Sequence, residues 1–140
     1  MSSPANANDR LADSAFARYP SLVDRIVLIT GGATGIGASF VEHFAAQGAR
    51  VAFFDIDASA GEALADELGD SKHKPMFLPC DLTDIDALQK AIADVKAVLG
   101  PIQVLVNNAA NDKRHTIGEV TRQFETGPGN YEAAIRAKLS

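Results

Sequence analysis

Residues 30–37, with the sequence TGGATGIG, decide the fold, because they join a short apolar run to a helical pattern. Gly31, Gly35 and Gly37 have the spacing G-x-x-x-G-x-G. Glycine allows positive φ and a close approach of the backbone to phosphate oxygens, and a helix that follows presents free N–H groups to an anion. A glycine-rich turn without a ligand is the alternative, but the strand–loop–helix context favours dinucleotide binding. No Gly-Lys-Ser/Thr follows, which argues against a P-loop.

Strand-like and helix-like segments alternate on both sides of this loop. Continuous apolar runs are typical of strands that are buried on both faces, and apolar residues at helical spacing predict helices. We expect strands at Arg25–Thr30, Arg50–Phe54, Met76–Pro79 and Ile102–Val106, and helices at Gly35–Gln47, Ala58–Leu68 and Asp84–Leu99, the last with Thr83 as its N-cap. Such alternation favours parallel crossovers. The predicted fold is therefore α/β, an incomplete Rossmann-type doubly wound parallel sheet of about four strands in the order 3-2-1-4.

The composition argues against several other classes of protein. The 140 residues are enough for one domain, and 18 acidic against 13 basic residues give a net charge of −5, which argues against a nucleic-acid partner. No apolar run is long enough to span a membrane. The single cysteine, Cys80, excludes an internal disulfide and suits a reducing cytoplasm. The three histidines lack metal-ligand spacing, so we expect no metal site.

Three zones divide the chain. Residues 1–20 are polar and predict a flexible N-terminal arm, with packing on a partner subunit through Phe16 and Tyr19 as the alternative. Residues 21–120 form the partial dinucleotide-binding domain. Residues 121–140 lose the alternating pattern and form a divergent tail.

Asp55 ends the second predicted strand, 18 residues after Gly37. A carboxylate at this place accepts hydrogen bonds from both ribose hydroxyls and repels a 2′-phosphate, which selects NAD over NADP. Thr34 and Ile56 stand where a basic residue would bind that phosphate, and neither is basic. The alternative is that Asp55 is a helix-capping or loop aspartate.

Two further motifs follow the third and fourth predicted strands: Cys80-Asp81-Leu82-Thr83 and Asn107-Asn108-Ala109-Ala110. With the glycine loop and Asp55, they make the chain resemble the short-chain dehydrogenase/reductase family over roughly Ser21 to Val120. The resemblance implies that Asp81 binds the adenine amino group, that Leu82 lies against the ring, that Asn107 stabilises the sheet and that Ala109 lies near the ribose. The implied NAD-binding residues are Gly31, Thr34, Gly35, Ile36, Gly37, Asp55, Ile56, Asp81, Leu82, Asn108, Ala109 and Ala110.

Alternatives stay open for two of these motifs. Asp81 can be an ordinary loop aspartate, and the Asn107–Asn108 pair can be purely structural. Ala110 departs from the glycine that the family usually has. The run NNAANDKRHTIGEVT at residues 107–121 looks most like bacterial sugar dehydrogenases of the family, which oxidise an aldose at C1 to a lactone.

The family's hydride transfer needs a tyrosine, a lysine four residues later and a serine. Tyr19 and Tyr131 are followed at that spacing by Val23 and Ile135, so no catalytic residue can be assigned. We expect an NAD-binding portion that is inactive alone. A non-catalytic NAD-binding or assembly module and a nonfunctional truncated product are the alternatives. The fourth strand and third helix would lack neighbours, which predicts self-association.

Overall fold

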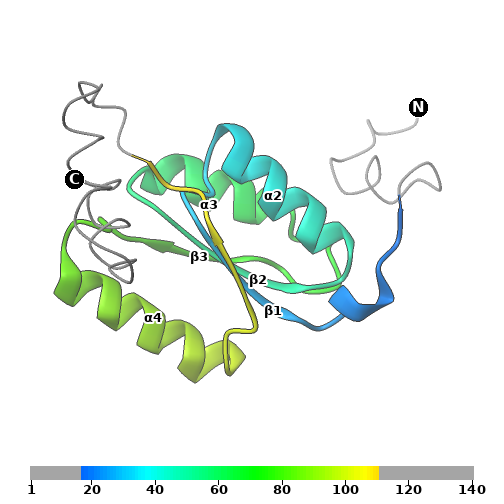
Figure 1. The fold of residues 1–140 in the computed structure, drawn as a ribbon. Coiled ribbons are helices and arrows are strands. Elements are labelled where there is room, and N and C mark those ends of the chain that lie inside the picture. The colour runs from blue at the N-terminus through cyan, green and yellow to red at the C-terminus, as the bar shows by residue number, and fades with distance from the viewer. Residues whose placement is uncertain (1–16, 111–140) are drawn as a thin grey trace, which may run out of the picture.

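The computed structural model describes residues 17–110 of the chain. Helices and strands alternate through this range (Figure 1). After a 3-10 turn, η1 (Pro20–Leu22), the elements are β1 (Ile26–Thr30), α2 (Gly35–Ala46), β2 (Arg50–Asp55), α3 (Ala58–Glu67), β3 (Met76–Pro79), α4 (Ile85–Leu99) and β4 (Val104–Asn107). Among the described residues, no helix is both long enough and apolar enough to cross a membrane.

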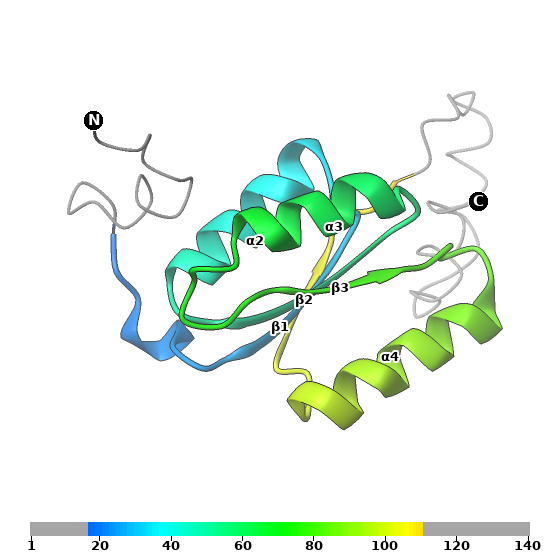
Figure 2. The same cartoon turned by 180° about the vertical axis from the view of Figure 1, so that it is seen from behind.

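The four strands form one parallel sheet in the order β3-β2-β1-β4, which confirms the predicted order. Val27 of β1 pairs with Val51 of β2 on one side and with Val104 of β4 on the other. Helices α2 and α3 cover one face of the sheet and α4 covers the other (Figures 1 and 2). This is the doubly wound α/β arrangement, in which ligands bind outside the carboxyl ends of the strands.

The core has two halves because successive residues of a strand point to opposite faces. Val27, Ile29 and Phe53 belong to the cluster beneath α2 and α3, where the rings of Phe53 and Phe77 lie 5.1 Å apart. Leu28 and Phe54 belong to the cluster against α4. All five residues of β1 are buried, which explains why its sequence is a continuous apolar run.

The predicted N-cap of α4 is wrong. Asp84, not Thr83, is the N-cap residue, and one of its carboxylate oxygens accepts a hydrogen bond from the Ala87 N–H at 3.1 Å. The Thr83 hydroxyl donates instead to Asp81 at 2.7 Å. Other ends differ by one or two residues. β2 includes Asp55, and β4 begins at Val104 rather than Ile102.

The end of the predicted N-terminal arm contacts the C-terminal end of α2. The side chain of Gln47 accepts from the Tyr19 N–H and donates to the Ala17 carbonyl, both at 2.8 Å. Arg18 donates to the last carbonyl of α2, that of Ala46, at 3.0 Å. Tyr19 is 56% exposed. Phe16 and the rest of the arm, and the tail at residues 121–140, lie outside the described residues.

Candidate functional site

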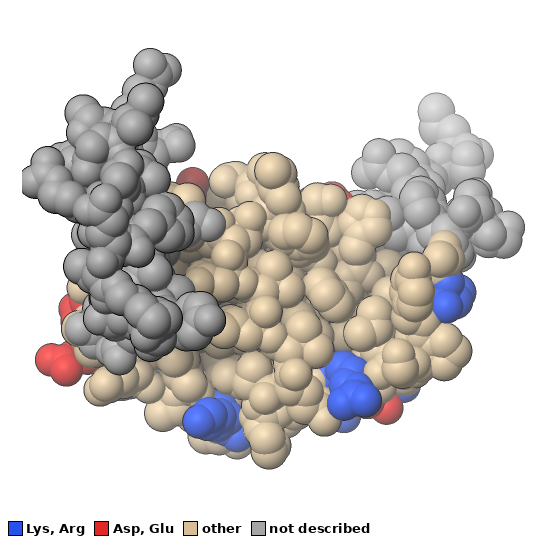
Figure 3. All heavy atoms as spheres, in the orientation of Figure 1, with Lys and Arg blue, Asp and Glu red and all other residues tan. Residues whose placement is uncertain are grey.

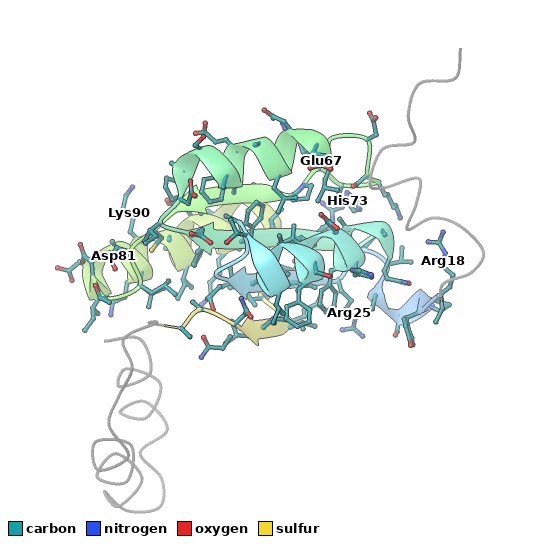
Figure 4. All side chains as sticks on the ribbon, turned by 90° about the horizontal axis from the view of Figure 1, so that it is seen from above. Arg18, Arg25, Glu67, His73, Asp81 and Lys90 are labelled. Carbon is teal, nitrogen blue, oxygen red and sulfur yellow. The ribbon has the colours of Figure 1, made fainter. Side chains whose placement is uncertain are left out.

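The carboxyl ends of all four strands border one cavity of about 780 Å³. Its walls contain every residue predicted for the cofactor except Gly35. The strand order lays these groups out in a row: Asp81 follows β3, Asp55 ends β2, the glycine loop follows β1 and Asn108 follows β4. Seen from above, Asp81 and the N-terminal Arg18 lie at opposite ends of the molecule (Figure 4). The N-terminal contacts are therefore remote from the cavity.

The glycine loop is held tightly at the carboxyl ends of β1 and β2. The N–H groups of Gly31 and Gly32 both donate to the Phe54 carbonyl, at 2.8 and 3.2 Å. A Cβ on Gly37 would lie 1.8 Å from the Gly31 carbonyl oxygen and 2.7 Å from the Asn108 amide nitrogen. Only glycine at position 37 lets the first turn of α2 come this close, which brings the helix end to the cavity.

The N-terminus of α2 offers backbone donors to that cavity. Thr34 is the N-cap residue but its side chain makes no capping hydrogen bond. The first bond of the helix runs from the Ala38 N–H to the Thr34 carbonyl at 3.2 Å, so the N–H groups of residues 35–37 have no partner within the helix. With the positive end of the helix dipole, they form an anion-binding arrangement.

Asp55 is held by the backbone at the middle of the row. One carboxylate oxygen accepts from the Ala33 N–H at 3.1 Å, and the other accepts from the Asp57 N–H at 3.0 Å. Asp57, rather than Asp55, caps α3, since its side chain accepts from the Ala60 N–H. This excludes the helix-capping alternative for Asp55 and leaves a fixed, half-buried carboxylate on the cavity wall.

Asp81 lies exposed at the β3 end of the row and receives two hydrogen bonds from one residue. The Thr83 hydroxyl donates to its Oδ1 at 2.7 Å, and the Thr83 N–H donates to the same oxygen at 3.0 Å. These two bonds favour the charged form and lower the pKa of Asp81, the hydroxyl contributing more. The apolar side chains of Ile56 and Leu82 line the same cavity.

The asparagine pair ties the end of β4 to the end of β1. The Thr30 hydroxyl donates to the side-chain oxygen of Asn107 and accepts from the Ala109 N–H, both at 3.1 Å. The side-chain amide of Asn108 donates to the Gly31 carbonyl at 3.1 Å. Both asparagines thus have structural bonds, while Asn108, Ala109 and Ala110 also line the cavity.

Three lining residues were not among the predicted ones: Phe54, Cys80 and Thr83. Each lies next to a predicted residue at a strand end, and this adjacency was the available signal. Cys80 is buried, and burial together with the negative charges of Asp81 and Asp84 raises the pKa of its thiol, so the reactive thiolate is disfavoured. Among residues 17–110 no group of three or more metal-ligating side chains comes together.

Comparison with known proteins places the chain in a family. The profile of the short chain dehydrogenase family matches residues 25–125. The chain is 45% identical over 108 residues to the "Probable galactose dehydrogenase" of Rhizobium meliloti, covering 76% of this chain and 42% of that protein. It is also 45% identical to the D-xylose 1-dehydrogenase of Caulobacter vibrioides, covering 77% and 42%. The chain belongs to the short-chain dehydrogenase family.

Solved structures agree with this assignment. A short-chain dehydrogenase/reductase mutant of Serratia marcescens matches with a TM-score of 0.64 and 27% identity, over 86% of this chain and 51% of that one. The 3-ketoacyl-(acyl-carrier-protein) reductase of Brucella melitensis, solved with NADH, matches with a TM-score of 0.60 and 28% identity, over 72% and 43%. The chain spans less than half the length of the two sugar dehydrogenases.

The tight packing at Gly37 predicts that a single added methyl group strongly destabilises the fold. Gly37→Ala should lower the free energy of unfolding by roughly 3 kcal/mol, the upper end of typical overpacking costs, because a backbone carbonyl must move. Gly35→Ala is the matched control. Position 35 has φ +58° but open space around its Cβ, so only about 1–2 kcal/mol of backbone strain is expected. Urea denaturation measures both, and equal losses would contradict this account of Gly37.

Proposed function

We propose that this chain is the NAD-binding portion of a short-chain dehydrogenase that transfers a hydride between a nicotinamide cofactor and an alcohol or sugar. One observation carries the proposal: the order of chemical groups along the sheet edge. Two carboxylates occupy the β3 and β2 ends, helix N–H groups without a partner in the helix occupy the β1 end and small residues occupy the β4 end. Neighbouring strands lie about 4.8 Å apart, so the row spans about 14 Å.

A dinucleotide has the complementary order of groups. In the proposed pose its adenine amino group donates to Asp81, and the adenine ring lies between the apolar side chains of Ile56 and Leu82. The ribose hydroxyls donate to Asp55, and the pyrophosphate accepts from the N–H groups at the start of α2. The nicotinamide half then lies beside Ala109 and Ala110. When bound, the nicotinamide supplies the hydride donor or acceptor of the reaction.

The preference for NAD over NADP rests on Asp55. Its carboxylate is fixed by the Ala33 and Asp57 N–H groups, so it cannot rotate away from a 2′-phosphate without losing those bonds. Neither Thr34 nor Ile56, which line the cavity beside it, supplies a compensating positive charge. Charge repulsion and the lost ribose bonds both act against NADP.

Asp55→Ala should reduce the preference for NAD. We expect the unchanged chain to bind NAD at least about tenfold more tightly than NADP, the equivalent of one charge-assisted hydrogen bond. The variant should bind the two within about threefold of each other. Asp57→Ser is the control, because it keeps an N-cap oxygen for α3 and should leave the ratio unchanged. Calorimetric titration with both nucleotides measures the ratio, and equal binding by the unchanged chain refutes the role of Asp55.

The proposed substrate is an aldose oxidised at C1. Support comes from the relatives named galactose and xylose dehydrogenase, at 45% identity. The proposed compartment is the reducing cytoplasm, which suits the buried free thiol of Cys80. The second candidate is a module that binds NAD or assembles with another chain without catalysis, and a nonfunctional truncated product is the third. Both are suggested by the absence of a Y-x-x-x-K sequence in the 140 residues.

The chain alone should produce no NADH from aldoses and NAD. Without the tyrosine and lysine that move the proton, a bound cofactor leaves a large barrier. Absorbance of NADH in the presence of galactose or xylose tests this. NADH formation that Gly37→Ala abolishes would show that the chain is itself catalytic. Reading the DNA beyond codon 121 in all three frames separates the candidates, because a downstream Y-x-x-x-K indicates a truncated dehydrogenase and its absence a dedicated module.

We also propose that the chain self-associates through β4 and α4. β4 is the outer strand of the described sheet beyond β1, and Leu105 on it is 61% exposed. On α4, Ile85 is 45% and Val98 67% exposed. β4 lies at the front in Figure 1, and the same face is mostly uncharged in Figure 3. An apolar strand with free backbone groups favours addition of a strand from a second copy.

Leu105→Lys should shift the chain toward monomer. A lysine on an edge strand opposes pairing, because its charge would have to lose water in the interface. Sedimentation velocity over a concentration series measures the change, and Ser59→Lys on the distant helix α3 is a charge-matched control. A monodisperse monomer before any substitution, melting cooperatively above about 60 °C, would contradict self-association.

A further inference from the structure

The hydroxyl of Thr83 does not cap the helix that follows it. A threonine before a helix ordinarily caps it, but Asp84 caps α4 here through the Ala87 N–H. The Thr83 side chain points away from the helix and toward Asp81, two residues earlier, where its hydroxyl donates to Oδ1 at 2.7 Å. Thr83 also lines the cavity. The helix therefore leaves this hydroxyl available to act on the carboxylate at the end of the row.

The two bonds from Thr83 determine which oxygen of Asp81 is available to a ligand in the cavity. Both the hydroxyl and the N–H of Thr83 donate to Oδ1, so the acceptor capacity of that oxygen is largely used. The second oxygen, Oδ2, keeps its lone pairs for a ligand. A side chain as exposed as Asp81 would otherwise sample several rotamers, and ordering it would weaken ligand binding.

We propose that Thr83 is a positioning residue that holds Asp81 so that its carboxylate selects a nucleobase with an exocyclic amino group. This inference rests on the proposed function, because it requires the base end of a dinucleotide to lie at the β3 end of the cavity. An amino group donates to a carboxylate, whereas the carbonyl oxygen that replaces it in hypoxanthine is an acceptor and meets the carboxylate's negative charge. A fixed carboxylate therefore distinguishes the two bases more strongly than a mobile one does.

Thr83→Val tests the role of the hydroxyl, and Thr83→Ser restores it. Valine keeps the shape of threonine and the backbone N–H but removes the stronger bond to Asp81. Calorimetry measures Kd for NAD and for nicotinamide hypoxanthine dinucleotide, which lacks the amino group. For the unchanged chain we expect about a tenfold preference for NAD, the equivalent of one charge-assisted hydrogen bond. The preference should fall to about threefold or less in Thr83→Val and return in Thr83→Ser.

Asp81→Ala separates this inference from the proposed function. If the unchanged chain prefers NAD, Asp81→Ala removes the preference and Thr83→Val keeps it, the positioning role is wrong and the proposed pose stands. If Asp81→Ala keeps the preference, Asp81 does not bind the adenine amino group. The proposed pose at the β3 end and the positioning role of Thr83 are then both wrong. If the unchanged chain binds neither nucleotide, the proposed function fails and the selection inferred for Thr83 falls with it.

A second measurement needs no cofactor. Carboxyl-carbon NMR of Asp81 across an acid titration reports its pKa, which the Thr83 bonds hold below the ordinary value in the unchanged chain. Loss of the hydroxyl should raise that pKa in Thr83→Val, and Thr83→Ser should bring it back down. Thermal melting of each variant confirms that the chain is folded. An unchanged Asp81 pKa in folded Thr83→Val would overturn the bond on which the inference depends.

Discussion

The site depends on the contact between the first turn of α2 and the end of β1. At this point the Gly31 carbonyl lies so close to Gly37 that no side chain fits between them, and the Asn108 amide donates to the same carbonyl. The consecutive elements β1 and α2 thus meet the distant end of β4 at one oxygen atom. Their meeting fixes the direction of α2, and with it the direction of the helix dipole and of the three N–H groups that have no partner within the helix.

The buried sheet makes that contact possible. β1 lies between β2 and β4 and has all five residues buried, so its carboxyl end is held by packing on both faces and by pairing on both sides. Residues just beyond a fixed strand end are fixed in turn. Asp55, the last residue of β2, shows this directly, because the loop N–H of Ala33 donates to its carboxylate. The row of groups along the edge is therefore a consequence of the strand order.

The sequence predicted the elements because each part of the pattern has one local cause, and their order followed from the parallel crossovers of a doubly wound sheet. Apolar runs, helical spacing and glycine stops indicate strands, helices and their ends without reference to the rest of the fold. The side-chain bonds at the site are different in kind. Thr83 and Asp84 are both good N-cap residues, and the choice between them depends on Asp81, whose place depends on β3 pairing with β2. The bond from Asn108 to Gly31 joins residues 77 positions apart, and no local pattern encodes it.

The site is suited to an anion although the chain has a net charge of −5. Screening shortens the reach of surface charges to about 8–10 Å at physiological ionic strength, so local groups decide what binds. At the β1 end these are helix N–H groups, and at the β2 and β3 ends they are the carboxylates of Asp55 and Asp81. An anionic group at the β2 or β3 end would be repelled by those carboxylates and would not reach the helix N–H groups. Attraction at the β1 end and repulsion at the β2 and β3 ends thus act together to favour an anionic group at the start of α2 over any other place along the cavity.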